Sequence, residues 1–238
     1  MIASQLQPAR PMPTFEPIPP DIGRREFARL FAVSRETSER LEIYARRLVE
    51  WQRTINLVAP ATLPQIWHRH FADSAQLLAL APASASTWVD LGAGAGFPGL
   101  VLAILLAERP SNARMVLIES DTRKAAFLGE VVRATGITGS MAVDIVSRRV
   151  ELPATRAMVG VADVITARAL APMDRLAELA APLFSGGTVA MFLKGRGLDA
   201  ELVEAERRWR LAYELVPSRT NEQGRIVVVR ALAAKAED

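Results

Sequence analysis

Residues 87–100, TWVDLGAGAGFPGL, decide the fold of this 238-residue chain. A short apolar run ends in Asp90, three glycines then alternate with small residues, and an apolar helical pattern runs from Leu100 to Ala107. This order of strand, tight loop and helix opens a βαβ unit. The glycines let the loop adopt positive φ and let a ligand lie against bare backbone, and the free N–H groups of the following helix favour an electron-rich ligand.

Two kinds of cofactor fit this loop. Residues 94–99 satisfy the G-x-G-x-x-G dinucleotide pattern, and Glu119 follows at about the distance of a ribose-binding acid. We expect the Asp90 carboxylate to point into the site, where it repels a pyrophosphate but suits an amino-acid ammonium. The run Asp-x-Gly-x-Gly-x-Gly from Asp90 also resembles the first motif of Rossmann-like methyltransferases, which use S-adenosylmethionine. A nicotinamide or flavin nucleotide and a purely structural turn are the alternatives.

The composition indicates a cytoplasmic protein with a sizeable core. Half of the residues are hydrophobic, there is no cysteine, and no run approaches the roughly 20 apolar residues of a membrane helix. The N-terminus lacks the apolar segment of a secretion signal. A formal charge of +3 permits a nucleic-acid partner without requiring one, and all but three of the 29 basic residues are arginine.

The chain divides into three parts. Residues 1–20 hold six of the fifteen prolines, which predicts a disordered or extended tail. Residues 21–86 form a helical arm and linker, with a helix over 35–53 that Ser34 caps. Its apolar face, spaced at three and four, consists of Leu41, Tyr44, Leu48, Trp51 and Ile55. The Thr62-Leu63-Pro64-Gln65 sequence predicts a capping box that opens a helix through His70, followed by another over 72–80.

Strand and helix patterns alternate over 87–238, which predicts a Rossmann-like α/β domain with a mostly parallel sheet. The expected strands are 87–91, 114–119, 139–143, 162–167, 187–193, 212–216 and 225–231, and the expected helices are 99–107, 122–135, 173–182 and 198–210. The loop over 218–224 is too short for a crossover helix, so the last two strands must pair antiparallel.

Several motifs together resemble the bacterial small-subunit rRNA guanine-N7 methyltransferase family, also called glucose-inhibited division protein B. The resemblance covers about residues 21–231, and Gln52 departs from it because the family usually has asparagine there. The motifs are Trp51-Gln52-x-x-x-Asn56-Leu57, Arg69-His70-Phe71-x-Asp73-Ser74, the glycine loop with Phe97-Pro98-Gly99, Glu119-Ser120, Arg123-Lys124-x-x-Phe127-Leu128, Arg149-Val150-Glu151, Ala167-Arg168-Ala169 and Phe192-Leu193-Lys194-Gly195.

The resemblance implies S-adenosylmethionine as cofactor, with Gly92, Gly94 and Gly96 around its methionine part. Phe97 packs near the cofactor in the family, although a plain core position is the alternative. Glu119 ends the second strand, where its carboxylate accepts the ribose hydroxyls, while Asp121 is the better candidate for a helix cap. The adenine-contacting pair is Val150 and Glu151, read through the backbone. Arg168, just past the fourth strand, is expected beside the cofactor as the catalytic residue.

Arg123, Lys124 and Lys194 follow strand ends on the same side and are candidates for rRNA phosphate contacts, with solvated surface charge as the alternative. We expect His70, Asp73 and Ser74 to form a polar latch between the helical arm and the sheet. They crowd within one helical turn, which excludes a hydrolase triad. The only two histidines, His68 and His70, make a histidine-based metal site improbable, so no metal is expected.

The implied acceptor is the guanine in the conserved decoding-region loop of 16S rRNA. Guanine N7 has a free in-plane lone pair, so its methylation removes no proton and requires no general base. The partner is naked rRNA, a small ribosomal subunit or an assembly intermediate, and we expect the enzyme to act as a monomer. A nucleotide-dependent oxidoreductase and a non-catalytic RNA-binding module are the rival functions.

Overall fold

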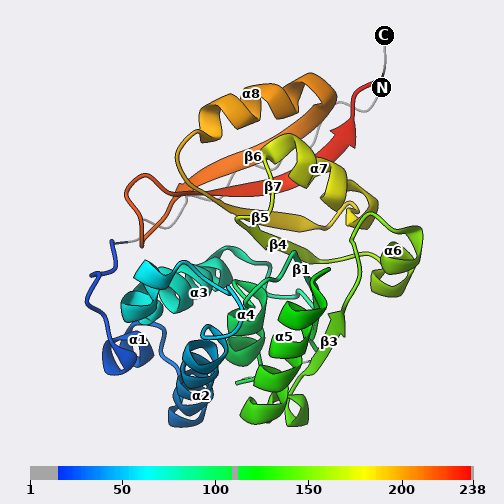
Figure 1. Ribbon diagram of the computed structural model, residues 1–238. Helices are drawn as coiled ribbons and strands as arrows, with labels where there is room; N and C mark the ends of the chain where they lie inside the picture. The colour runs from blue at the N-terminus through cyan, green and yellow to red at the C-terminus, as the bar shows by residue number, and fades with distance from the viewer. Residues whose placement is uncertain (1–15, 109–111, 237–238) are drawn as a thin grey trace.

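A computed structural model describes residues 16–108 and 112–236. Its centre is a seven-stranded sheet in the order β3-β2-β1-β4-β5-β7-β6 (Figure 1). The strands are β1 (Thr87–Leu91), β2 (Arg114–Ile118), β3 (Ala142–Val146), β4 (Val164–Arg168), β5 (Val189–Lys194), β6 (Trp209–Pro217) and β7 (Arg225–Ala234). β1 to β5 pair in parallel, and β7 is antiparallel to both β5 and β6. The expected Rossmann-like fold and its antiparallel last strand are confirmed.

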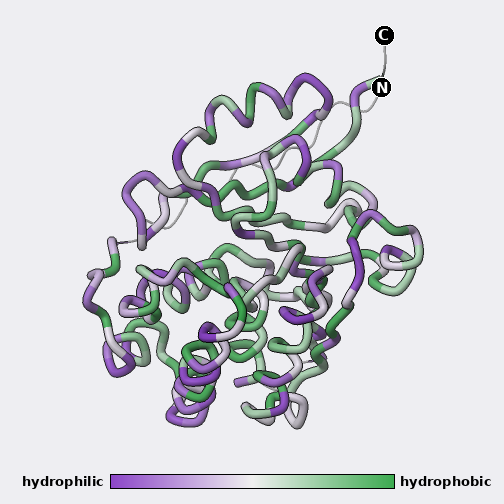
Figure 2. The backbone as a smooth tube through the Cα atoms, viewed as in Figure 1, coloured by the Kyte–Doolittle hydropathy of each residue, from purple (hydrophilic) through white to green (hydrophobic). Residues whose placement is uncertain are grey.

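Two hydrophobic layers cover the two faces of this sheet. Trp88 of β1 joins the layer under α4 and the helical arm, whereas its neighbour Val89 joins the layer under α6, α7 and α8. This alternation follows from the two-residue period of a strand. Hydrophobic segments lie along the strands between the layers, and the outer turns of α2 and α8 carry hydrophilic residues (Figure 2).

The helices after β1 are α4 (Gly99–Leu106), α5 (Thr122–Thr135), α6 (Pro153–Val159), α7 (Met173–Ala180) and α8 (Leu198–Arg208). All of them except α6 are close to their expected limits. The sequence prediction missed α6, which begins at a proline in its first turn. It also started β3 at residue 139, three residues too early, because the left-handed Gly136 ends α5 and a short 3₁₀ turn over Ile137–Gly139 follows.

The helical arm packs against α4 and α5 rather than standing apart from the sheet. It consists of α1 (Arg24–Leu30), α2 (Arg35–Trp51), a short helix α3 (Asp73–Ala75) and the turns around it. Ser34 caps α2 as expected, accepting from the backbone N–H of Thr37 at 3.1 Å. The apolar face of α2 is confirmed by full burial of Leu41, Tyr44 and Leu48.

The two helices expected over 62–70 and 72–80 are not formed as regular helices. A 3₁₀ turn over Pro60–Gln65, a π-helical turn over Trp67–Ala72, α3 and a second 3₁₀ turn over Gln76–Leu80 replace them. The capping-box prediction was wrong, since the Thr62 hydroxyl donates to the carbonyl of Ala59 and contacts His70 instead of capping a helix. Proline inside the first turn and polar side chains buried in the second explain the irregular backbone.

The predicted disordered or extended tail needs correction at its end. Residues 1–15 lie outside the described part of the chain, but residues 16–20 form a strap against the fold. Ile18 is buried, its N–H donates to the carbonyl of Arg219 at 2.7 Å, and its carbonyl contacts Nε2 of His68 at 3.0 Å. Prolines here keep the strap extended while one apolar side chain anchors it. No helix within 16–108 and 112–236 has the length and apolarity to cross a membrane.

Candidate active site

The glycine loop between β1 and α4 has the geometry of a backbone cradle. Gly92, Gly94 and Gly96 have φ of +62°, +56° and +91°, a region that side chains with a Cβ rarely adopt. A Cβ on Gly96 would lie 2.5 Å from the Tyr44 hydroxyl, so that glycine serves packing. A Cβ on Gly94 would meet nothing nearer than a carbonyl at 3.7 Å, so the backbone there borders open space.

Asp90 lies beneath this loop rather than in its opening. Its side chain is fully buried, with Oδ2 accepting from the N–H of Gly99 at 3.0 Å and Oδ1 accepting from the Thr166 hydroxyl at 2.6 Å. Burial raises the pKa of this carboxyl to about 7, and the two hydrogen bonds oppose the rise. Asp90 thus joins the end of β1 to the first turn of α4 and to β4, and its contact with a cofactor stays a prediction.

Glu119, just past β2, faces the other side of the loop. Its Oε2 accepts from the N–H of Gly94 at 2.8 Å and its Oε1 accepts from the N–H of Asp121 at 2.7 Å. The N-cap of α5 is Asp121, as expected, and not Glu119. A carboxylate is thus held within hydrogen-bonding distance of Gly94, which borders open space whereas Gly92, Gly96 and Gly99 of the same loop do not.

The pair Val150 and Glu151 follows β3 on the same edge of the sheet. Val150 is buried in the hydrophobic layer under α6, so its side chain is used in packing. Glu151 forms an ion pair with Arg175 of α7, and the first cause of its lowered pKa is a hydrogen bond with its own backbone N–H. These positions leave the backbone as the group available to a ligand.

Phe97 occupies an aromatic stack that joins the loop to the arm. Its ring centroid lies 5.3 Å from that of Tyr44 and 4.7 Å from that of His70, with interplanar angles of 16° and 21°. The Arg168 guanidinium carbon lies 4.9 Å from the same ring centroid. The side chain is only 4 % exposed, so its contacts favour the core interpretation of Phe97.

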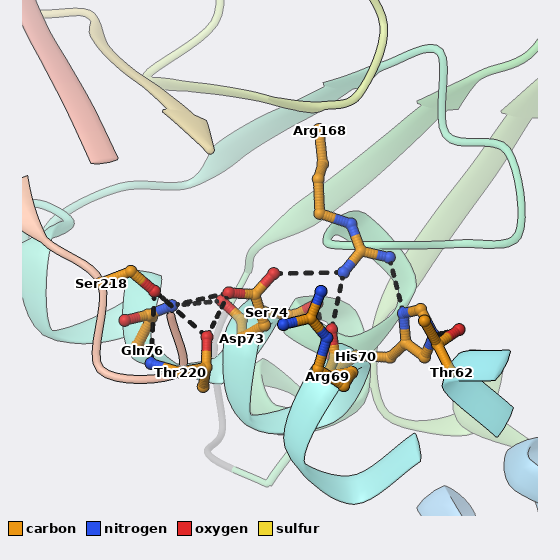
Figure 3. A network of polar contacts seen from close by, with 9 residues as sticks. All are labelled: Thr62, Arg69, His70, Asp73, Ser74, Gln76, Arg168, Ser218 and Thr220. Carbon is orange, nitrogen blue, oxygen red and sulfur yellow. Dashed lines mark hydrogen bonds and ion pairs between the residues drawn. The ribbon is translucent and has the colours of Figure 1, made fainter. Parts of the chain in front are cut away.

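Arg168 extends from the end of β4 into the helical arm (Figure 3). Its Nη1 donates to the carbonyl of Arg69 and to Oδ2 of Asp73, both at 3.1 Å, and its Nη2 donates to Nδ1 of His70 at 3.0 Å. Asp73 also accepts from the Thr220 hydroxyl of the β6–β7 loop at 2.6 Å. We call Arg168, His70, Asp73 and Thr220 the latch, because they join β4, the arm and the β6–β7 loop.

The latch confirms the expected polar contact between arm and sheet and identifies the partner of His70. Burial, reinforced by the charges of Arg168 and Arg69, lowers the pKa of His70 to about 3. A neutral imidazole that accepts at Nδ1 carries its proton on Nε2, and that N–H donates to the Thr62 hydroxyl at 2.8 Å. Both nitrogens of His70 are therefore engaged. Ser74, the third expected member, donates instead to the carbonyl of His70.

The three candidate phosphate contacts differ in exposure. The Arg123 side chain is 73 % exposed beside Asp121, and Lys124 is half-buried on the same turn. Lys194 is only 12 % exposed, its Nζ lying 2.5 Å from Oε2 of Glu201 and 3.0 Å from the carbonyl of Ala171. Lys194 is thus already neutralised, which argues against the predicted phosphate contact.

A cavity of about 500 Å³ opens beside the latch, across Arg168 and Ala169 from the glycine loop. Its walls come from the arm, from the ends of β4 and β5, and from the β6–β7 loop. Ala169 has φ of +53°, and this turn lays the Leu170 side chain over Gly92. The cavity and the glycine loop are therefore separated by a single short segment. No cluster of three potential metal ligands occurs within the described ranges.

The contact of Tyr44 with the glycine loop was not predicted from the sequence. Its spacing placed Tyr44 on the apolar face of a helix, yet its hydroxyl donates to the carbonyl of Ala95 in the glycine loop. A buried tyrosine hydroxyl requires a partner, which was the available signal. Thr166 under Asp90 and Glu201 beside Lys194 were missed as well, since neither belongs to a recognisable motif.

Comparison with known proteins matches this geometry to one family. The family model described as GidB, rRNA small subunit methyltransferase G, matches residues 37–225, from α2 to the start of β7. The chain belongs to this family. A relative from Parvibaculum lavamentivorans, "Ribosomal RNA small subunit methyltransferase G", is 48% identical over 90% of this chain and 92% of its own. One of the same name from Methylobacterium radiotolerans is 49% identical over 85% and 92%.

The matched range includes most of the helical arm and the strands β1 to β6, so the latch lies wholly inside it. Among solved structures, a variant of MtNAS in complex with S-adenosylmethionine is similar in fold, with a TM-score of 0.51 and 16% identity over 87% of this chain and 83% of that chain. At this identity the similarity supports the fold alone.

Proposed function

We propose that this protein transfers a methyl group from S-adenosylmethionine to N7 of a guanine in the conserved decoding-region loop of 16S rRNA. Membership of the rRNA small subunit methyltransferase G family supports the reaction class and the rRNA substrate. The observation that carries the proposal is the open backbone at Gly94 with the Glu119 carboxylate bonded to it.

The residues around the loop fit this cofactor. Bare backbone at Gly94 leaves room that a Cβ would fill, as close approach of a methionine part requires. A carboxylate at a strand end, such as Glu119, suits the paired hydroxyls of a ribose. The backbone of residues 150 and 151 remains the candidate adenine contact. Asp90 would hold the loop in place from beneath, through its bonds to Gly99 and Thr166. In this proposal it does not pair directly with the ammonium group of the cofactor.

The bound cofactor supplies an electrophilic methyl group on a sulfonium. When the carbon–sulfur bond breaks and the N7–carbon bond forms, the guanine becomes cationic and no proton leaves it. No general base is therefore needed, and the engaged, neutral His70 fits this requirement. The chain's contribution is positioning of the two reactants and exclusion of water.

Arg168 acts in this proposal as a positioning residue. The guanidinium fork binds the carbonyl of Arg69, the carboxylate of Asp73 and the ring nitrogen of His70. Because its face also covers Phe97, it fixes the end of β4 relative to the glycine loop. In this proposal Arg168 affects methyl transfer indirectly, by fixing the position of the glycine loop, rather than by touching the reactants.

The remaining parts of the proposal concern partner and location. The enzyme acts in the cytoplasm as a monomer on naked 16S rRNA, on the small subunit or on an assembly intermediate. The exposed Arg123 is the strongest of the three predicted phosphate contacts. Arg69, exposed at the mouth of the cavity, adds a fourth candidate.

Two measurements test the proposal. Calorimetric titration with S-adenosylhomocysteine and with NAD should give binding of the first only, and binding of NAD alone would favour an oxidoreductase. Mapping of N7-methylguanine in 16S rRNA from cells with and without the gene should show one decoding-region site lost in the deletion strain. Unchanged methylation would contradict the proposal and support a non-catalytic RNA-binding module.

A further inference from the structure

The two acidic residues that line the cavity beside the latch, Asp73 and Glu201, differ in how many of their oxygens already accept a hydrogen bond. Both oxygens of Asp73 are engaged, since Oδ1 accepts from Thr220 and Gln76 and Oδ2 accepts from Arg168. Glu201, in the first turn of α8, uses only Oε2, which accepts from the N–H of Met173 at 3.0 Å and pairs with Lys194 at 2.5 Å. No donor within the described ranges reaches its Oε1.

We propose that this cavity receives the target guanine and that Glu201 recognises its N1–H and N2 amino edge. The inference rests on the proposed function, because it takes guanine N7 as the methyl acceptor. It assigns a specificity-determining role to a side chain outside every motif of the sequence. The preference of the cavity for guanine can be measured by binding alone, without methyl transfer.

The cavity borders the short segment that lies against the glycine loop, so a base bound in it lies next to that loop. Arg168 and Ala169 line the cavity, while the next residue, Leu170, lies against Gly92 and the Arg168 guanidinium covers Phe97. A volume of about 500 Å³ falls within the range of roughly 300–1,000 Å³ typical of small-molecule pockets. A base taken out of its stack is read in such a pocket by contacts to its edges.

The chemistry of guanine then fixes which edge faces Glu201. N7 and O6 lie on the Hoogsteen edge of guanine, and the N1–H and N2 amino donors lie on the neighbouring Watson–Crick edge. If N7 faces the glycine loop, the Watson–Crick edge faces other residues of the cavity, and Glu201 of α8 is one of them. A carboxylate has about four lone-pair positions, and Glu201 uses two of them on Oε2. Oε1 therefore retains the acceptor capacity that both guanine donors require.

The surrounding residues hold Glu201 ready for this role. The Lys194 ammonium and the Met173 N–H both contact Oε2 of Glu201, and these two contacts hold the carboxylate in place. Adenine would place the unprotonated N1 against the same oxygen, and inosine would lack the N2 amino donor. The arrangement accordingly selects guanine over both. Apolar walls at Leu57 and Leu193 border the space for the ring faces.

The test compares purine nucleotides on the full-length protein with saturating S-adenosylhomocysteine. Wild type should bind guanosine 5′-monophosphate at least roughly tenfold more tightly than inosine or adenosine 5′-monophosphate by calorimetry, since one good base-edge contact discriminates by about this factor. Glu201→Gln should abolish the preference. Glu204→Gln, one turn along α8 and 54 % exposed, is the matched control and should retain it.

The outcomes separate this inference from the proposed function. Absence of nucleotide binding by wild type, or an unchanged preference in folded Glu201→Gln, would overturn the guanine pocket. Binding of S-adenosylhomocysteine with no purine preference leaves the proposed function standing alone. A purine preference without S-adenosylhomocysteine binding would contradict the proposed cofactor while the preference of the cavity for guanine would stand. Should Glu201→Gln lose its thermal transition, Glu201→Asp, which shortens the carboxylate by one methylene, provides the variant and should weaken the preference.

Discussion

The hydroxyl of Tyr44 donates to the main-chain carbonyl of Ala95, so the middle of α2 reaches directly into the glycine loop. Both groups are buried, and burial raises the pKa of the tyrosine well above its usual value. The same ring stacks on Phe97. The helical arm is therefore part of the structure that shapes the cradle, and its mutation should be felt at the cofactor.

Tyr44→Phe should weaken S-adenosylhomocysteine binding and lower the melting temperature. The change leaves a buried carbonyl without its donor, which costs about 1–3 kcal/mol. Calorimetry and thermal denaturation measure the two effects. Tyr213→Phe is the control, since it removes a hydroxyl that bonds the exposed side chain of Glu206 far from the loop. Equal behaviour of the two variants would contradict a role for Tyr44 at the cradle.

Asp90→Asn should become more stable relative to wild type as the pH rises. The folded-state pKa of Asp90 is raised to about 7 from 3.8, so the folded protein holds a proton that the unfolded chain releases. Wild-type stability from this group is full below about pH 4 and is lost as the pH rises toward 7. The asparagine does not titrate, and it preserves an acceptor for Gly99 and a partner for Thr166.

Melting temperatures of the two proteins between pH 4 and 8 measure this difference. Asp90→Ala is the contrasting variant, because it leaves the Gly99 N–H and the Thr166 hydroxyl unpaired at every pH, at about 1–3 kcal/mol each. A pH-independent difference between Asp90→Asn and wild type would show that the carboxyl titrates normally.

Arg168→Lys should be almost as defective as Arg168→Ala in methyl transfer. A lysine keeps the charge but loses the fork that reaches three acceptors at once. Each variant should lose on the order of a hundredfold in single-turnover rate on small subunits, because misplacement by about 1 Å has this effect. Near-wild-type rates for the lysine variant would rule out positioning. Asp73→Asn combined with Arg168→Ala should be less damaging than the two effects added.

Ile18→Ala should lower the stability of the protein by about 2–5 kcal/mol, the usual cost of truncating a buried isoleucine. Chain deletion tests the same strap: removal of residues 1–20 should reduce the melting temperature, whereas removal of 1–15 eliminates none of the described contacts. Thermal denaturation of the three proteins distinguishes them. Equal melting temperatures for the two deletions would show that the strap contributes nothing.

Local patterns predicted the fold well because its signals lie within short stretches. The glycine loop, the alternation of strands and helices, and the burial of Leu41 and Leu48 all follow from residue spacing. The partners of Arg168 are different: Asp73 is 95 residues away in the chain, and His70 is 98. No spacing rule connects such positions. The neutralisation of Lys194 by Glu201 likewise depends on how α8 packs against β5.

The arm was the least predictable part for a related reason. Thr62 has the sequence of a helix cap, but its hydroxyl is used by His70 and the carbonyl of Ala59. A buried polar contact outweighed a local preference, and the helix became a series of tight turns. Asp90 shows the same effect at the site, where its buried carboxylate accepts hydrogen bonds from Gly99 and Thr166, which no sequence motif connects to it.

The position of β7 determines when the sheet can finish folding during synthesis. This strand comes last in the chain, yet it lies inside the sheet, between β5 and β6. During synthesis, β6 emerges with no neighbouring strand to pair with, and the edge of β5 stays open until β7 has left the ribosome. The loop that carries Thr220 to Asp73 also closes only then. A chain that stops before Arg225 would thus lack the strand that joins β5 to β6.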